Sequence, residues 1–154
     1  FNNAKDLKGV IGKYIEEHDS MKKDIERYIA EAVDAARKKL VDNARVVGGV
    51  NVVSAVLPIK AAAVKDLVFR IRQDIPQNLL CVIGSVDDGK PMLSVMLSDD
   101  MVSEHKLNAG QMVREAARLI NGGGGGQPHF ATAGGKNADM LSAAVDKVIE
   151  LAAL

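Results

Sequence analysis

Aromatic residues and net charge are both scarce in this chain. Aromatics make up 3% of it and tryptophan is absent, so Ala, Val, Leu, Ile and Met must build the core. Few rings remain to stack on exposed nucleobases. Basic and acidic side chains balance at 20 each, and dividing the chain near residue 45 reveals no basic half. Bulk charge therefore indicates no nucleic-acid partner, and any contact with RNA must come from a local cluster.

The sequence also excludes an internal disulfide and a membrane-spanning helix. Cys81 is the only cysteine, which is typical of a reducing compartment, so we expect a cytoplasmic protein. No apolar run approaches the roughly 20 residues that a membrane-spanning helix needs, and we expect no membrane partner. The chain starts at Phe1 with neither a Met nor a signal-like segment, so we expect a piece of a longer protein.

Residues 1–47 are predicted to form a long helical arm. No proline occurs between Ala4 and Val46, and apolar residues recur at alternating steps of three and four, as in a coiled coil. The seam comprises Leu7, Ile11, Tyr14, Met21, Ile25 and Tyr28. A stripe this narrow needs a partner, which is a second copy, another domain or RNA. Packing on the chain's own globular domain is the alternative.

Residues 48–154 are predicted to form a globular α+β domain, a small mixed sheet layered with helices. Gly48-Gly49 is expected to cap the arm helix, and Asp99 or Asp100 to cap a short helical turn. The first two strands are joined through a helix, which favours a parallel pair, and Asp88-Gly89 indicates an antiparallel hairpin. The expected elements are strand 50–57, helix 61–73, strand 79–86, strand 92–97, helix 108–121 and helix 137–154.

The most distinctive segment is rich in glycine. Five consecutive glycines, Gly122 to Gly126, cost conformational entropy to order, so a folded domain would rarely keep them as filler. The spacing is not that of a nucleotide-phosphate loop. A flexible linker or a tight crossover are the alternatives. Because an apolar stretch and a second glycine pair, Gly134-Gly135, follow at once, we expect an ordered loop at 122–126.

This segment closely resembles the signature of the C-terminal, DHH-associated domain of alanyl-tRNA synthetases. Gln127 and His129 depart from the family pattern, which commonly has a basic and an acidic residue there. The helix-to-strand junction around Gly48 and the hairpin at Asp88 follow the family's order, so the resemblance covers essentially the whole chain. The matching residues are Gly122 to Gly126, Pro128, Phe130, Ala131, Gly134, Gly135 and Lys136.

The resemblance implies an RNA-binding appendage. In the family this domain docks on the outer corner of tRNA and links aminoacylation with editing, and its helical arm supports dimers. We therefore expect tRNA, other domains of the parent chain and a second copy as partners. The parent ligase would use ATP, Mg²⁺ and an editing-site Zn²⁺, whereas this piece is expected to hold no cofactor and to bind without catalysing.

Four basic residues are the expected phosphate-facing group, beside the backbone N–H groups of the two glycine runs. Arg114 and Arg118 stand four apart on the helix before the glycines, Lys106 precedes that helix and Lys136 closes the segment. The alternative is a solvated helix face on which Arg118 pairs with Glu115.

Two other functions remain open. One is the substrate-binding domain of a DHH-family phosphoesterase, and the other is a coiled-coil oligomerisation module without RNA contact. The histidines His18, His105 and His129 are scattered, with no cysteine near them, so the spacing predicts no metal site.

Overall fold

The computed structural model describes residues 3–154, with side chains from Asp6 onward. The chain divides into two compact units, Phe1–Ala35 and Ala36–Leu154. Helix α1 (Asn3–Asp42) makes up the described part of the first unit and continues into the second. No helix within the described residues is long and apolar enough to cross a membrane.

The predicted seam residues of α1 all face solvent. Their exposed fractions lie between 49% for Ile11 and 68% for Tyr14, and Val10, Ile15 and Ile29 beside them are also exposed. The helix therefore displays an apolar stripe, as an unpaired coiled-coil strand would. Pairing of two such arms stays a prediction.

A six-stranded mixed sheet forms the centre of the described second unit. The strands follow the order β1-β2-β3-β4-β6-β5, and only β2 and β3 run parallel. The α+β class, the parallel pair and the antiparallel hairpin are thus confirmed. The strand bounds are β1 Arg45–Val47, β2 Val50–Leu57, β3 Leu79–Asp87, β4 Lys90–Leu97, β5 Gly123–Gly126 and β6 Phe130–Gly134.

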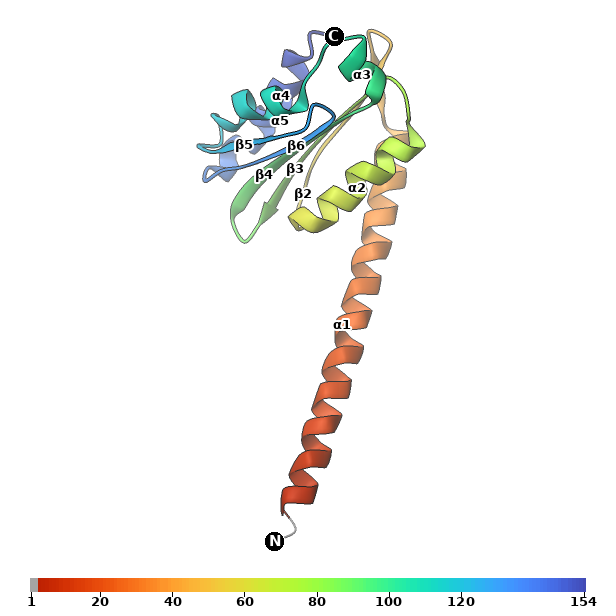
Figure 1. Ribbon diagram of the computed structural model, residues 1–154, viewed down its shortest axis with the longest axis vertical. Helices are drawn as coiled ribbons and strands as arrows, with labels where there is room; N and C mark the ends of the chain where they lie inside the picture. The colour runs from red at the N-terminus through yellow and green to blue at the C-terminus, as the bar shows by residue number, and fades with distance from the viewer. Residues whose placement is uncertain (1–2) are drawn as a thin grey trace. The chain divides into compact units, whose positions relative to one another are not determined.

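Helices cover both faces of this sheet (Figure 1). Helix α2 (Ala61–Asp74) lies on one face, and α4 (Ala109–Ala117) packs with α5 (Leu141–Leu151) on the other. The buried strand β3 packs against both layers. Leu80 and Val82 enter the α4–α5 core, and Cys81 between them points to the opposite face, which α2 covers. Each fully buried aliphatic side chain contributes about 1.5–3 kcal/mol, which fixes the sheet between its two layers.

Helix α1 ends at Asp42, about four residues earlier than predicted. The β-branched residues of Arg45–Val47 form an edge strand instead of a last helical turn. Gly48 and Gly49 have φ of +57° and +84°, the left-handed conformation that a two-residue hairpin turn requires, and they join β1 to β2. The expected role of the glycine pair as a helix cap is wrong.

The short helix α3 (Asp99–Ser103) begins after Ser98, which takes the cap position expected for Asp99 or Asp100. Its polar residues are engaged with the start of β3. The Ser98 hydroxyl oxygen accepts the Leu79 N–H at 2.9 Å, and the Asp100 carboxylate accepts the Asn78 N–H at 2.7 Å. These bonds fix the turn that leads toward α4.

The ends of the last two long helices also differ from the prediction. Asn108 is the N-cap of α4, as its predicted start required, and its side-chain oxygen accepts the Gln111 N–H at 3.1 Å. However, α4 stops at Ala117, and a turn ending at Asn121 replaces its last predicted residues. A 3₁₀ turn, η1 (Ala138–Met140), precedes α5, which ends at Leu151 rather than Leu154.

Candidate functional site

The glycine run is a β-strand, not the loop that the sequence predicted. Strand β5 pairs antiparallel with β6, and the Gln127 N–H closes the hairpin on the Phe130 carbonyl at 2.8 Å. A β-carbon on Gly122, Gly124 or Gly126 would come closer than 3.0 Å to the backbone of β6. No side chain fits at these alternating positions, so the pairing with β6 requires glycine at all three of them. A flexible linker is thereby excluded.

The outer edge of β5 is a row of bare peptide groups. It is the last strand of the sheet, and residues 123, 124 and 126 are exposed. In an antiparallel ladder, peptide groups alternate between the partner strand and the free side. Because Gln127 bonds inward to Phe130, the N–H and C=O groups of Gly124 and Gly126 point to the free edge. A β-carbon on Gly110 of α4 would lie 3.1 Å from the Gly126 carbonyl oxygen, so α4 approaches that end of the edge. The open donor and acceptor are those of Gly124, which is exposed.

Helix α4 lies along this strand and carries a guanidinium group over it. The Ala109 N–H at its start donates to the Pro128 carbonyl at 2.8 Å, and the Ala117 carbonyl at its end accepts the Gly122 N–H at 2.9 Å. A β-carbon on Gly125 would lie 3.4 Å from the Arg114 guanidinium. Arg114 therefore stands directly beside the glycine edge, as an anion-binding residue would.

The other three predicted cations are spread along α4. Arg118 takes the C-cap position, and the Lys136 N–H donates to the Ile120 carbonyl at 2.8 Å, which places both at the C-terminal end of the helix. Lys106 lies before the N-terminal end of the helix and has a left-handed backbone conformation, with φ +57°. The expected cluster is thus a row along the helix, with Lys106 at its far end.

All four cations are exposed, and none forms an ion pair within the described residues. Glu115 in particular makes no ion pair with Arg118, because the bond between those residues joins the Arg118 N–H to the Glu115 carbonyl. Cations that lack local counter-charges are available to an external anion.

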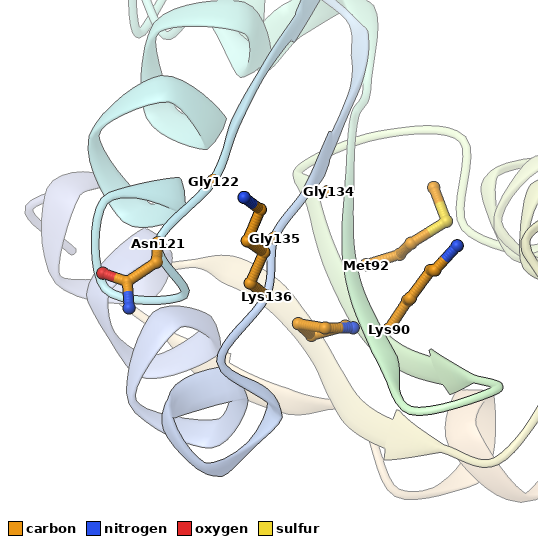
Figure 2. Close-up of a pocket in the computed structure, with 8 residues that line it drawn as sticks. Lys90, Met92, Asn121, Gly122, Gly134, Gly135 and Lys136 are labelled. Atoms are coloured by element: carbon orange, nitrogen blue, oxygen red, sulfur yellow. The ribbon is translucent and has the colours of Figure 1, made fainter.

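A shallow pocket of about 320 Å³ opens where the start of β4 lies beside the end of β6 and Gly122. Figure 2 shows Lys136 running back over Gly135 toward Gly122, and Lys90 beside Met92 on the other side of the pocket. The sequence analysis missed Lys90. Its position after Gly89 suggested only a turn, and the fold alone brings that turn to the glycines.

Chemistry of other kinds has little support in the described part of the chain. Cys81 is fully buried in β3, and burial raises the pKa of its thiol to about 12, so the thiol stays protonated near neutral pH. From Asp6 to Leu154, no three His, Cys, Asp or Glu side chains gather as metal ligands.

Comparison with known proteins identifies the family. Residues 49–154 match the model of the DHHA1 domain. The chain belongs to the DHHA1 domain family. The arm, residues 1–47, lies outside the matched region. The glycine strand, α4 and the pocket all lie inside it.

The curated relatives of this DHHA1 domain include alanine–tRNA ligases. The ligase of Bacteroides thetaiotaomicron is 51% identical over 154 residues, which is all of this chain and 18% of that protein. The ligase of Cytophaga hutchinsonii is 41% identical over 148 residues, or 96% of this chain and 16% of that protein. The chain thus spans less than a fifth of the length of these relatives.

Solved structures share the DHHA1 fold. The C-Ala domain from Aquifex aeolicus alanyl-tRNA synthetase has a TM-score of 0.65 and 25% identity, and the match covers 73% of this chain and 99% of that one. RecJ from Thermus thermophilus, crystallised with Mg²⁺, has a TM-score of 0.55 and 16% identity over 82% of this chain and 18% of its own. The RecJ likeness concerns the fold alone.

Proposed function

We propose that this chain is the tRNA-binding part of an alanine–tRNA ligase, and that it docks on the outer corner of tRNA through β5 and α4. The observation that carries the proposal is the exposed peptide edge of β5 with Arg114 beside it and Arg118 and Lys136 at one end. Arg114 forms no ion pair within the described residues. The 51% identity to a ligase over the whole chain supports the same assignment.

The chemistry of this edge suits folded RNA. Guanidinium and ammonium groups attract phosphates, and arginine can engage a phosphate with two parallel hydrogen bonds. Exposed backbone N–H and C=O groups can pair with phosphate oxygens and 2′-hydroxyls, which display the shape of RNA and not its sequence. A tRNA corner offers both groups on a rigid surface, so the scarcity of aromatics is no obstacle.

In the parent chain, this docking would link aminoacylation with editing by holding the tRNA body while its acceptor end changes sites. We assign the arm, residues 1–47, to a supporting role that includes homodimer contact, and residues 48–154 to RNA. The steps that need ATP, Mg²⁺ and Zn²⁺ would belong to other parts of the ligase, and this chain would bind without catalysing.

A DHH-family phosphoesterase remains the second candidate because RecJ shares the fold. That likeness is at 16% identity, whereas the ligase relatives reach 51%, so sequence favours the ligase. A coiled-coil module is the third candidate, supported by the exposed stripe of α1. Light scattering across a range of concentrations would reveal dimers, and dimers without any tRNA binding would favour the module.

The direct test measures binding of the chain to an intact tRNA(Ala) transcript and to an acceptor-stem hairpin that lacks the outer corner. The proposal predicts tight binding to the transcript, at least tenfold weaker binding to the hairpin, and a steep loss of affinity with salt. Equal affinity for both RNAs would contradict docking at the corner.

A further inference from the structure

The globular unit has two aromatic residues, Phe69 and Phe130, and the fold brings them together. They are 61 positions apart in the sequence, yet their ring centroids lie 5.2 Å apart with an interplanar angle of 59°. Such tilted pairs stabilise one another. Phe69 nevertheless remains 37% exposed, so this ring pair is a surface feature and not part of the core.

The ring pair lies one strand in from the glycine edge. Phe130 begins β6 and stands opposite Met96 of β4, on the face of the sheet that α2 covers. The next residue, Ala131, is paired with Gly126 of β5, and neighbouring strands are about 4.8 Å apart. An RNA chain that follows the β5 edge therefore passes beside these rings.

The surface next to Phe69 has the charge that a nucleotide needs. Ala62, Lys65, Asp66 and Phe69 form one shallow, open face of α2. Lys65 is exposed one helical turn before Phe69, and no acid in the described part of the chain forms an ion pair with it. Asp66 would repel a phosphate, but its carboxylate lies 2.9 Å from Arg70 and is neutralised by it.

We propose that Phe69, supported from behind by Phe130, is a stacking surface for one unpaired nucleobase of the bound tRNA, with Lys65 facing that nucleotide's phosphate. The inference rests on the proposed function, because it adds a base contact to docking that is otherwise directed at the backbone. Stacking on an aromatic ring tolerates any base, so this contact adds affinity and orientation without reading sequence. It also explains why Phe69 is exposed in a chain that has few aromatic residues.

Replacing Phe69 by Ala is expected to weaken binding to the tRNA transcript about tenfold, the usual scale for one lost base stack. The salt dependence should stay unchanged, because no charge is removed. Phe69→Leu should weaken binding similarly, since it keeps apolar volume but loses the ring. Met140→Ala is the matched control: Met140 is 38% exposed in η1, before α5, and its removal should leave affinity unchanged. Thermal unfolding of each variant checks that it is folded.

Phe69→Trp supplies the second readout, because the chain has no tryptophan of its own. Its emission should be quenched on adding tRNA, and not on adding the acceptor-stem hairpin. If the wild-type chain binds no tRNA, the proposed function fails. If the wild type binds, but Phe69→Ala binds equally well and the Phe69→Trp emission is unchanged, the stacking inference alone is overturned.

Discussion

Helices α2 and α4 cover opposite faces of one sheet, and each has two arginines at or near its C-terminal end. In α2, Arg70 lies 2.9 Å from Asp66 and Arg72 lies 2.6 Å from Asp99. In α4, Arg114 and Arg118 have no such acid within the described residues. Helix α2 neutralises its two arginines with nearby acids, whereas Arg114 and Arg118 of the α4 region stay without one beside the glycine strand. Composition could not separate these two cases, because Asp99, the partner of Arg72, is distant from it in the sequence.

The largest effect should come from the strand on which α4 rests. Replacing Gly124 by Ala forces a β-carbon against the β6 backbone, and we expect the free energy of unfolding to fall by at least about 2 kcal/mol. Gly123→Ala is the control, since a β-carbon there meets open space and should cost under about 1 kcal/mol. Urea denaturation of both variants measures the difference. Equal stabilities would mean that the glycine strand is not ordered as described.

The next effect concerns RNA. Removing Arg114 and Arg118 together should weaken binding of tRNA about tenfold or more and lower the salt slope by about 1.5, because two phosphate contacts are lost. The charge-matched control removes Arg72 and Lys147, which lie 2.6 Å from Asp99 and 3.1 Å from Glu150. Anisotropy titrations between 50 and 200 mM salt, roughly the range where such contacts are felt, measure both. If the control variant weakens binding as much, the unpaired arginines have no special role in binding RNA.

The same arginines should rank in the reverse order in their effect on the free energy of unfolding. Arg72→Ala removes an ion pair and is expected to cost about 0.5–1 kcal/mol, a small value because the Asp99 side chain is 87% exposed. Arg114→Ala removes no ion pair and should change stability by less than about 0.5 kcal/mol. Matched urea curves decide this. A larger loss for Arg114→Ala would show that its guanidinium serves the fold.

The smallest effect involves Asp100 at the start of α3. Burial by itself raises the pKa of this carboxyl, but hydrogen bonds from Ser98 and the Asn78 backbone outweigh burial and hold the pKa below its usual value. A lowered pKa in the folded state stabilises the protein above the unfolded value of about 3.9, and this stability is lost as pH falls through the folded value. The stability advantage of wild type over Asp100→Asn should therefore be constant above about pH 5 and shrink below pH 4. An advantage that is the same at pH 3 and pH 7 would contradict the assignment.

The regular part of the fold was predictable because its signals are local. Runs of β-branched or apolar residues predict strands β2, β3 and β4, and Asn108 is a favourable residue at the start of a helix. The family resemblance, carried by the glycine segment, was confirmed by the DHHA1 match and by the ligase relatives.

What could not be predicted depends on tertiary contact. Strand propensity is a property of side chains, so a run of five glycines predicts a loop. Only the close fit against β6 makes four of them, Gly123–Gly126, a strand. The three residues of β1 are too few to show a period. Lys90 and the Phe69–Phe130 pair were missed for the same reason, since each depends on segments that are distant in the sequence.

Footprinting of tRNA by the whole chain tests the central assignment most directly. We expect protection of the outer corner from backbone cleavage, reduced when Arg114 and Arg118 are replaced by Ala and retained when Arg72 and Lys147 are replaced. Protection confined to the acceptor stem, or corner protection that both variants keep in full, would contradict the account.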